Sequence, residues 1–249
     1  MACNSKDIGR LKIGRILAMM RSKKYVVYKE PFKLNIIGVR RANTQDDMFD
    51  DKMYVLWKDE DNNWEGREYS ITTDPSTKYL LQGGIGTFDG KKATAILPNG
   101  QYIDKWTIRK HNGKYDALCQ RNDADGKICV YRDYDRDSTL TFNIEDKNCG
   151  NYGINIHKAK NGGADDGEGN TKKIGSYSAG CQVFQNSYCF QEVMDMAYKQ
   201  RGLYGNNFTY TLFDLSLQRK FRIKRTFFGV AIIGSLAFIS YGIYKVIKK

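Results

Sequence analysis

The stretch Tyr152-Gly153-Ile154-Asn155-Ile156-His157 decides the fold, together with the later stretch Ser178-Ala179-Gly180-Cys181-Gln182. The apolar residues of the first stretch predict a strand that ends in His157, where an imidazole stands at the edge of a sheet. The small residues of the second stretch predict a turn that exposes the Cys181 thiol and leaves backbone N–H groups to hold an oxyanion. Together they predict a cysteine nucleophile with its base, which is the machinery of acyl transfer.

The composition is that of a globular protein rich in β-structure. The chain has 249 residues, 41% of them apolar and 27% charged, which excludes disorder and allows one substantial domain or two small ones. It holds 17 Tyr and 12 Phe but only three Pro, and aromatic side chains suit the pleated, half-buried surface of a sheet. We therefore expect a mainly β fold of the α+β class.

The basic charge lies at the two ends of the chain. Residues 1–30 carry eight Lys and Arg against two acids, a net +6, and residues 218–249 carry eight against none, a net +8. Since the whole chain is +12, residues 31–217 sum to −2. A nucleic-acid-binding body would carry its own basic face, so this distribution disfavours nucleic acid and favours anionic lipid or a virion partner.

The cysteines give no sign of a metal site or of a disulfide scaffold. No C-x-x-C spacing occurs among the six, which are Cys3, Cys119, Cys129, Cys149, Cys181 and Cys189. Basic residues interrupt every apolar run near the N-terminus, so no cleavable signal peptide is visible. We therefore expect no zinc and no cofactor, and most thiols free and reduced.

A calcium loop is the other metal motif to consider. Asp133-Tyr134-Asp135-Arg136-Asp137-Ser138 has carboxylates at alternate positions, as such a loop begins. Its sixth position is Ser138 where the motif needs glycine, and its twelfth is Ile144 where the motif needs glutamate. Charge-paired strand faces explain the pattern better, and no metal is predicted.

The end of the chain predicts a membrane span. Residues 226–244 are 19 without a charge, bounded by Arg225 and Lys245, and a helix of that length reaches about 28 Å, close to the thickness of the hydrocarbon layer. The alternative is a buried core helix. Ala231 and Ser235 form a small-xxx-small pair that favours self-association of the helix. Five basic residues precede the span and three follow it, which favours a body on the cytoplasmic side, but a margin of two charges leaves the side of the membrane open.

The chain divides into four parts: a basic N-terminal arm (1–33), a β-rich domain (34–201), a connector with a basic collar (202–225) and the transmembrane helix (226–244). Residues 8–20 can be drawn as a basic amphipathic helix, but two glycines weaken it, and a loosely packed arm is expected. The acidic, glycine-rich segment 161–173 predicts a mobile loop beside the site.

Short β segments at regular spacing predict a sandwich or barrel for the central domain. The expected strands are 34–40, 53–57, 94–97, 102–109, 128–131 and 140–144. Residues 72–76 form a turn, and apolar residues at helical spacing predict one helix over 189–201 that packs on the sheet.

Each candidate site residue also has a plain structural explanation. Cys181 is a nucleophile or a buried structural thiol, and His157 is its base or an ordinary hydrogen-bonded side chain. The amides of Gly180 and Cys181 are expected to face a developing oxyanion. The chain has only one other histidine, His111, for which an exposed turn is the default, although it could also line the cleft.

At these residues the chain resembles bacteriophage and bacterial proteins that look like relatives of the L,D-transpeptidase (YkuD-like) catalytic domain. The matching segments span roughly residues 36 to 200 and are 73–76, 115–118, 130–133, 153–157 and 178–182. The better-known transpeptidases carry a second histidine where this chain has Ala179, and commonly an arginine shortly after the cysteine, where this chain has Gln182 and Val183.

The resemblance implies a β-rich domain whose cysteine takes an acyl group from a peptidoglycan stem peptide, at the bond between a diamino acid and D-alanine. Cys181 would be the nucleophile and His157 its base, while Ser178 and Gly180 would shape the turn and the oxyanion site. The acyl group would pass to an amine or to water. The expected function is therefore a membrane-anchored, cysteine-dependent peptidoglycan-processing protein, phage-encoded or virion-associated. The alternative is a non-catalytic viral or structural membrane protein that uses the fold as a binding module.

Overall fold

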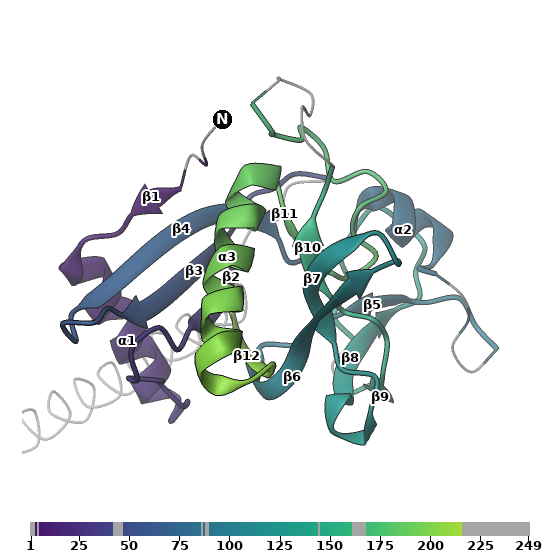
Figure 1. Cartoon of the computed structure of the whole chain (residues 1–249). Helices are drawn as coiled ribbons and strands as arrows, with labels where there is room; N and C mark the ends of the chain where they lie inside the picture. The colour runs from purple at the N-terminus through teal and green to yellow at the C-terminus, as the bar shows by residue number, and fades with distance from the viewer. Residues whose placement is uncertain are drawn as a thin grey trace, which may run out of the picture.

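A computed structural model describes residues 3, 5–41, 47–85, 87, 90–143, 145–160 and 168–215. This part of the chain is mainly β with a few packed helices, which confirms the expected α+β class (Figure 1). The helices are α1 (Arg10–Ser22), α2 (Thr77–Gln82), α3 (Ser187–Tyr204) and a 3₁₀ turn, η1 (Ala124–Gly126).

Most strands belong to one large sheet that closes on itself. They are β1 (Lys6–Asp7), β2 (Asn35–Arg40), β3 (Asp51–Lys58), β4 (Trp64–Thr72), β6 (Gly100–His111), β7 (Tyr115–Gln120), β10 (Ile156–Lys158), β11 (Gln182–Phe184) and β12 (Phe208–Asp214). Their order is β1-β4-β11-β10-β7-β6-β12-β2-β3, and β3 also pairs with β4 along its whole length. This closing pair removes the two long edges that an open sheet would expose.

A second sheet has three short antiparallel strands, β5 (Thr94–Ile96), β8 (Ile128–Asp133) and β9 (Lys147–Gly150). Five of the six expected strands coincide with observed ones. The expected strand 140–144 is wrong over its described residues 140–143, which have no regular structure. The Asp133 carboxylate accepts the backbone N–H of Thr141, so this N–H bonds to a side chain and not to a neighbouring strand.

Helix α3 packs on the inner face of the large sheet, as expected from its apolar spacing (Figure 1). Asn186 caps its start, since the side-chain oxygen accepts the backbone N–H groups of Tyr188 and Cys189. Four buried side chains one turn apart face the core: Phe190, Val193, Met194 and Ala197. The helix therefore covers the apolar face that the closed sheet would otherwise leave open.

Helix α1 corrects the expectation of a loosely packed arm. It covers the opposite face of the sheet with four buried residues, Ile13, Ile16, Leu17 and Met20. These lie against Ile37, Leu56 and Phe213 of strands β2, β3 and β12. The two glycines do not interrupt this apolar stripe, because Gly9 is the N-cap and Gly14 lies on the exposed face.

Strand β12 shows that part of the expected connector and collar, 202–225, belongs to the sheet. It lies between β6 and β2 in the middle of the sheet, and all seven residues are buried. The buried threonine hydroxyls of this strand form hydrogen bonds within the protein. The Thr209 hydroxyl bonds to the Tyr28 hydroxyl at 2.8 Å, and the Thr211 hydroxyl accepts from the Gln101 side-chain amide at 3.1 Å. The domain therefore extends beyond residue 201, at least to Asp214.

Two disulfides overturn the expectation of mostly free thiols. Cys129 and Cys149 are direct partners in the β8–β9 pairing, and Cys3 is bonded to Cys189 at the start of α3. Only Cys119 and Cys181 are free. Sequence spacing does not reveal these pairs, because strand pairing creates the first and the docking of the N-terminal segment creates the second.

None of the described helices is long and apolar enough to cross a bilayer. The predicted span 226–244 lies outside the described residues, as do residues 161–167 of the predicted mobile loop.

The packing of α1 can be tested with Met20→Ala, since Met20 is 1% exposed. The cavity left behind should lower the free energy of unfolding by about 3 kcal/mol. Leu11→Ala on the same helix is the matched control, because Leu11 is 82% exposed, and it should stay within about 0.5 kcal/mol of the wild type. Urea unfolding of both variants checks this, and equal stabilities would show that the helix does not dock.

Candidate functional site

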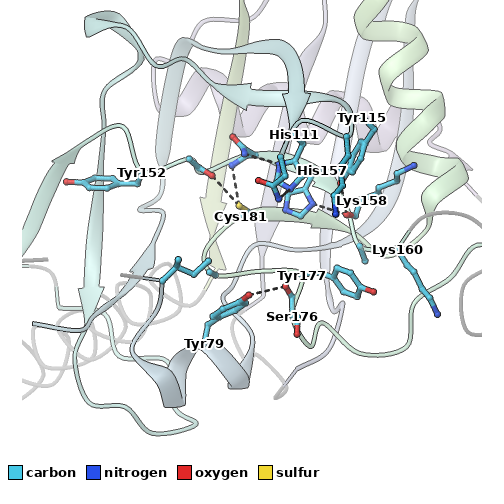
Figure 2. A pocket seen from close by; sticks show the side chains of 17 residues that line it. Tyr79, His111, Tyr115, Tyr152, His157, Lys158, Lys160, Ser176, Tyr177 and Cys181 are labelled. Atoms are coloured by element: carbon cyan, nitrogen blue, oxygen red, sulfur yellow. Dashed lines mark hydrogen bonds between the residues drawn. The ribbon is translucent and has the colours of Figure 1, made fainter. Parts of the chain in front are cut away.

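The candidate site is an open pocket of about 630 Å³ that contains Cys181, His157 and His111 (Figure 2). Most of its wall comes from the end of the β6–β7 hairpin, the chain from Tyr152 to Lys160, and the chain from Ser176 to Cys181, and Tyr79 and Ile85 add to it. The two stretches that predicted a nucleophile and its base therefore meet at one cavity.

The parallel pairing of β10 with β11 brings the two stretches together. Ile156 pairs with Gln182 and His157 with Val183. One residue earlier, the backbone N–H of Gln182 donates to the Asn155 carbonyl at 2.9 Å. This register places Cys181, which immediately precedes β11, beside the backbone that leads into His157.

The Cys181 thiol lies between two backbone groups. The N–H of Asn155 points at the sulfur at 3.4 Å, and the thiol donates to the Gly153 carbonyl at 3.4 Å. Burial raises the pKa of the thiol to about 11, although the N–H of Asn155 acts in the opposite direction by favouring the thiolate. In its resting state the site therefore holds a neutral thiol.

The hydrogen bond of His157 fixes its tautomer. Its Nδ1 lies 2.8 Å from the backbone oxygen of Lys158, which can only accept, so Nδ1 carries the proton. The remaining lone pair belongs to Nε2, which is the atom that can take a proton. Burial, helped by the neighbouring His111, lowers the pKa of His157 to about 3, so the imidazole rests neutral.

His111 is part of the site and not merely an exposed turn residue. It is the last residue of β6, half-buried, and its ring stacks on His157 with centroids 4.2 Å apart and planes 18° from parallel. Its Nδ1 also lies 3.1 Å from the Asn155 side-chain amide. Asn155 and His157 are two residues apart in an extended stretch, and this spacing predicts that their side chains lie on the same face.

Ser178 and Gly180 shape the turn from behind and do not line the pocket. The backbone N–H of Gly180 donates to the Ser178 hydroxyl at 3.3 Å, so this amide is engaged within the turn, and its role at an oxyanion stays a prediction. Gly180 has φ +116°, and a Cβ there would lie 2.3 Å from the Ala95 carbonyl oxygen, so only glycine fits. Within the described part of the chain the N–H of Cys181 makes no backbone hydrogen bond, so it is a candidate oxyanion donor.

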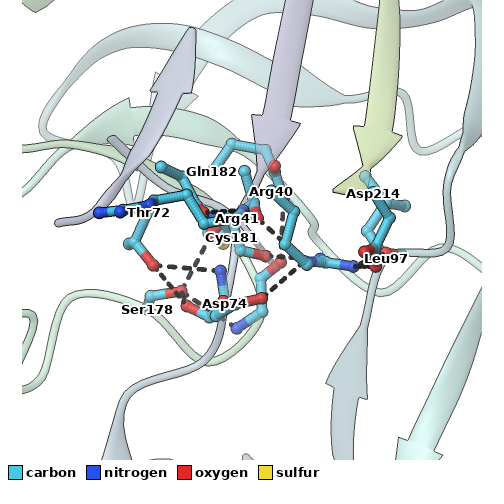
Figure 3. Close-up of polar contacts among 12 residues, drawn as sticks. Arg40, Arg41, Thr72, Asp74, Leu97, Ser178, Cys181, Gln182 and Asp214 are labelled. Carbon is cyan, nitrogen blue, oxygen red and sulfur yellow. Dashed lines mark hydrogen bonds and ion pairs between the residues drawn. The ribbon is translucent and has the colours of Figure 1, made fainter. Parts of the chain in front are cut away.

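A buried arginine stands behind this turn (Figure 3). Arg40, the last residue of β2, is 1% exposed. It pairs with Asp74 at 2.7 Å and with Asp214 at 3.3 Å, and it donates to the backbone oxygens of Thr73 and Leu97. The guanidinium therefore joins the ends of strands β2, β4, β5 and β12.

The same cluster holds the cysteine turn in place. The Ser178 hydroxyl lies 2.7 Å from the Asp74 carbonyl oxygen, and the backbone N–H of Ser76 donates to the Ser178 carbonyl at 2.8 Å. Asp51 supports Thr73 by accepting its backbone N–H and hydroxyl at 2.7 Å each. Burial and the negative charge of Asp74 raise the pKa of Asp51 to about 7. Segment 73–76, which lies in the expected turn 72–76, thus links Arg40 to the turn that carries Cys181.

Within the described residues, no cluster of three or more His, Cys, Asp or Glu side chains is arranged to hold a metal ion. The predicted calcium-like stretch uses its first carboxylate internally, since Asp133 accepts the backbone N–H groups of Asp135 and Thr141.

Comparisons with family models, with curated proteins and with solved structures found no match to this chain. The family resemblance of segments 153–157 and 178–182 therefore stays a prediction. The geometry of the site itself carries the functional inference.

Removal of the buried guanidinium tests the support of the turn. Arg40→Met leaves three carboxylates, Asp51, Asp74 and Asp214, buried without their cation, which should cost about 3 to 5 kcal/mol of unfolding free energy. Arg41→Met is the matched control, because this neighbour is exposed and only its backbone N–H enters the cluster. Guanidinium unfolding checks both variants, and a loss below 1 kcal/mol in Arg40→Met would contradict the assigned role.

Proposed function

We propose that this protein is a cysteine-dependent acyl-transfer enzyme of the L,D-transpeptidase type that acts on peptidoglycan stem peptides. The observation that carries the proposal is the free Cys181 thiol in an open pocket with His157, whose Nε2 is left as the basic nitrogen by the Nδ1 bond to Lys158. A nucleophile, a base and a group that orients the base are the three parts that covalent acyl transfer needs.

The reaction has two balanced steps. The Cys181 sulfur attacks the carbonyl of the acyl donor while its proton passes to Nε2 of His157. The leaving amine takes that proton, and a thioester remains. An acceptor amine or water then attacks the thioester, gives up a proton through His157, and restores the thiol. The first acceptor gives transpeptidation and the second gives hydrolysis.

The resting site is neutral, which determines how the base works. A raised thiol pKa and a lowered imidazole pKa disfavour a stored thiolate–imidazolium pair. Proton transfer therefore accompanies the attack, as general-base catalysis, and the charge forms only when substrate has filled the pocket and displaced water.

The charge of the pocket supports a carboxylate-bearing substrate. Three lysines, Lys114, Lys158 and Lys160, line it, and the described lining residues include no Asp or Glu. Lys158 is half-buried, with its ammonium 4.7 Å from the centre of the Tyr115 ring, and burial lowers its pKa. A partly desolvated cation binds a carboxylate more strongly than an exposed one, and stem peptides carry carboxylates.

The disulfides support a position on the side of the membrane where peptidoglycan lies. Cys3–Cys189 and Cys129–Cys149 are bonds that persist in oxidising compartments. The distribution of basic residues around segment 226–244 favours the opposite orientation, but its margin is two charges. We therefore assign the body to the oxidising side, anchored through segment 226–244 or carried by a virion.

A second candidate is a binding module that keeps the fold without catalysis, as part of a viral or structural membrane protein. The observation in its favour is the Gly180 amide, which is engaged by Ser178 and leaves the oxyanion site with fewer donors than expected.

Acylation of Cys181 tests the first candidate against the second. Incubation of the full chain with muropeptides or a carbapenem should give a covalent adduct on Cys181, seen by mass spectrometry. His157→Gln should slow its formation by about a hundredfold to ten-thousandfold, because the base is lost. Cys119→Ser, which removes the other free thiol, is the control and should react at the wild-type rate. A folded protein without adduct or turnover would leave the binding module as the function.

Lys158→Ala tests the carboxylate contact. The change should lower kcat/KM for a stem peptide with a free carboxylate about tenfold, and leave kcat/KM for the matching carboxamide peptide unchanged. Lys127→Ala, an exposed lysine that does not line the pocket, is the control. Equal losses of kcat/KM for the carboxylate and carboxamide peptides would show that Lys158 does not bind the substrate carboxylate.

A further inference from the structure

Asn155 connects the thiol to the second histidine. Its backbone N–H points at the Cys181 sulfur at 3.4 Å, and its side-chain Nδ2 lies 3.1 Å from Nδ1 of His111. A group that fixes the Asn155 side chain therefore also fixes the N–H that stabilises negative charge on the sulfur.

The orientation of the Asn155 amide follows from a third contact. Its Oδ1 accepts the backbone N–H of Gln120 at 2.9 Å, so the amino group, and not the oxygen, faces His111. An amino group can only donate. Nδ1 of His111 must therefore carry a lone pair, which leaves the proton on Nε2. Nε2 lies 3.2 Å from the side-chain amide of Asn112, so this exposed amide must present its oxygen to the ring. The contact with Asn155 exists only while His111 is neutral.

The surroundings of His111 favour the neutral form. The titratable and charged groups about the ring are the stacked His157, the Tyr115 ring 5.5 Å away, and the lysines of the same pocket, Lys114 and Lys158. The described lining residues offer no carboxylate that would stabilise an imidazolium. Burial lowers the pKa of His111, in agreement with this geometry.

We propose that His111 is a positioning residue of this site: as a neutral imidazole it accepts from Asn155 and so holds the Asn155 backbone N–H on the Cys181 sulfur. Protonation of His111 places a hydrogen on Nδ1, which turns the acceptor into a donor facing another donor. Asn155 is then released, and Cys181 loses reactivity on the acid side beyond the titration of the thiol itself.

The inference rests on Cys181 as the nucleophile of the proposed function, but its test needs no peptidoglycan. The readout is the rate at which iodoacetamide alkylates Cys181 between pH 4.5 and 8.5, in a Cys119→Ser background so that one thiol reacts. In His111→Gln the side-chain oxygen still accepts from Asn155 and does not titrate. His111→Phe keeps a stacked ring without an acceptor. Lys110→Gln, an exposed change in the same hairpin, is the control.

The ratio of the wild-type rate to the His111→Gln rate cancels the thiol's own titration. We expect this ratio to be near one at pH 8 and to fall, by up to about tenfold, as the pH drops below 6.5 and His111 takes a proton. We also expect His111→Phe to react about tenfold more slowly than His111→Gln at pH 8. If His111→Phe does not fold, the pH dependence of the ratio decides alone. A ratio that does not change with pH, or a folded His111→Phe that reacts as fast as His111→Gln, overturns the proposal. Such a result would leave the acylation of Cys181 by a carbapenem unaffected, so the two proposals fail separately.

Discussion

The ion pairs of the buried Arg40 are the interaction on which the rest of the structure depends. Its guanidinium reaches Asp74 and Asp214 and two backbone carbonyls, so that one side chain joins four strand ends that are distant in sequence. A buried cation gains little net stability, because its desolvation cost offsets its attraction to the carboxylates. Its contribution is geometric: the carboxylates can be buried only where the guanidinium meets them, which fixes segment 73–76 and, through it, the turn of Ser178.

The position of the turn determines the chemistry at the pocket. Gly180 lies too close to the Ala95 carbonyl for any side chain, so the turn packs directly against the small sheet. This packing positions Cys181 beside Asn155, in the same pocket as His157. Farther along, the Tyr210 hydroxyl donates to the Gln182 side chain at 2.8 Å, in the space that Gly38 leaves open. Burial keeps the Cys181 thiol and the His157 imidazole neutral, so in the proposed reaction charge forms only when the sulfur attacks.

Three features of the molecule agree with the proposed function. The described chain holds two disulfides, the pocket has lysines and no acid among its described lining residues, and residues 31–217 are nearly neutral in charge. A neutral body with a small basic pocket suits a small anionic ligand better than a nucleic acid, which requires an extended basic surface. The proposed stem-peptide substrate has the size and the charge that such a pocket accepts.

The sequence by itself determined the β-rich class, five of the six expected strands and helix α3, because these elements bury one apolar face at a regular spacing. It also singled out Cys181 and His157, which stand in short stretches of unusual composition and which the structure brings to one candidate pocket. Only the tertiary structure decided the roles of α1 and β12, whose stability comes from faces covered by distant partners. The same holds for the disulfides, for Arg40 and for His111: each depends on residues that strand pairing brings together, and a contact between strands leaves no periodic mark in the sequence of either one.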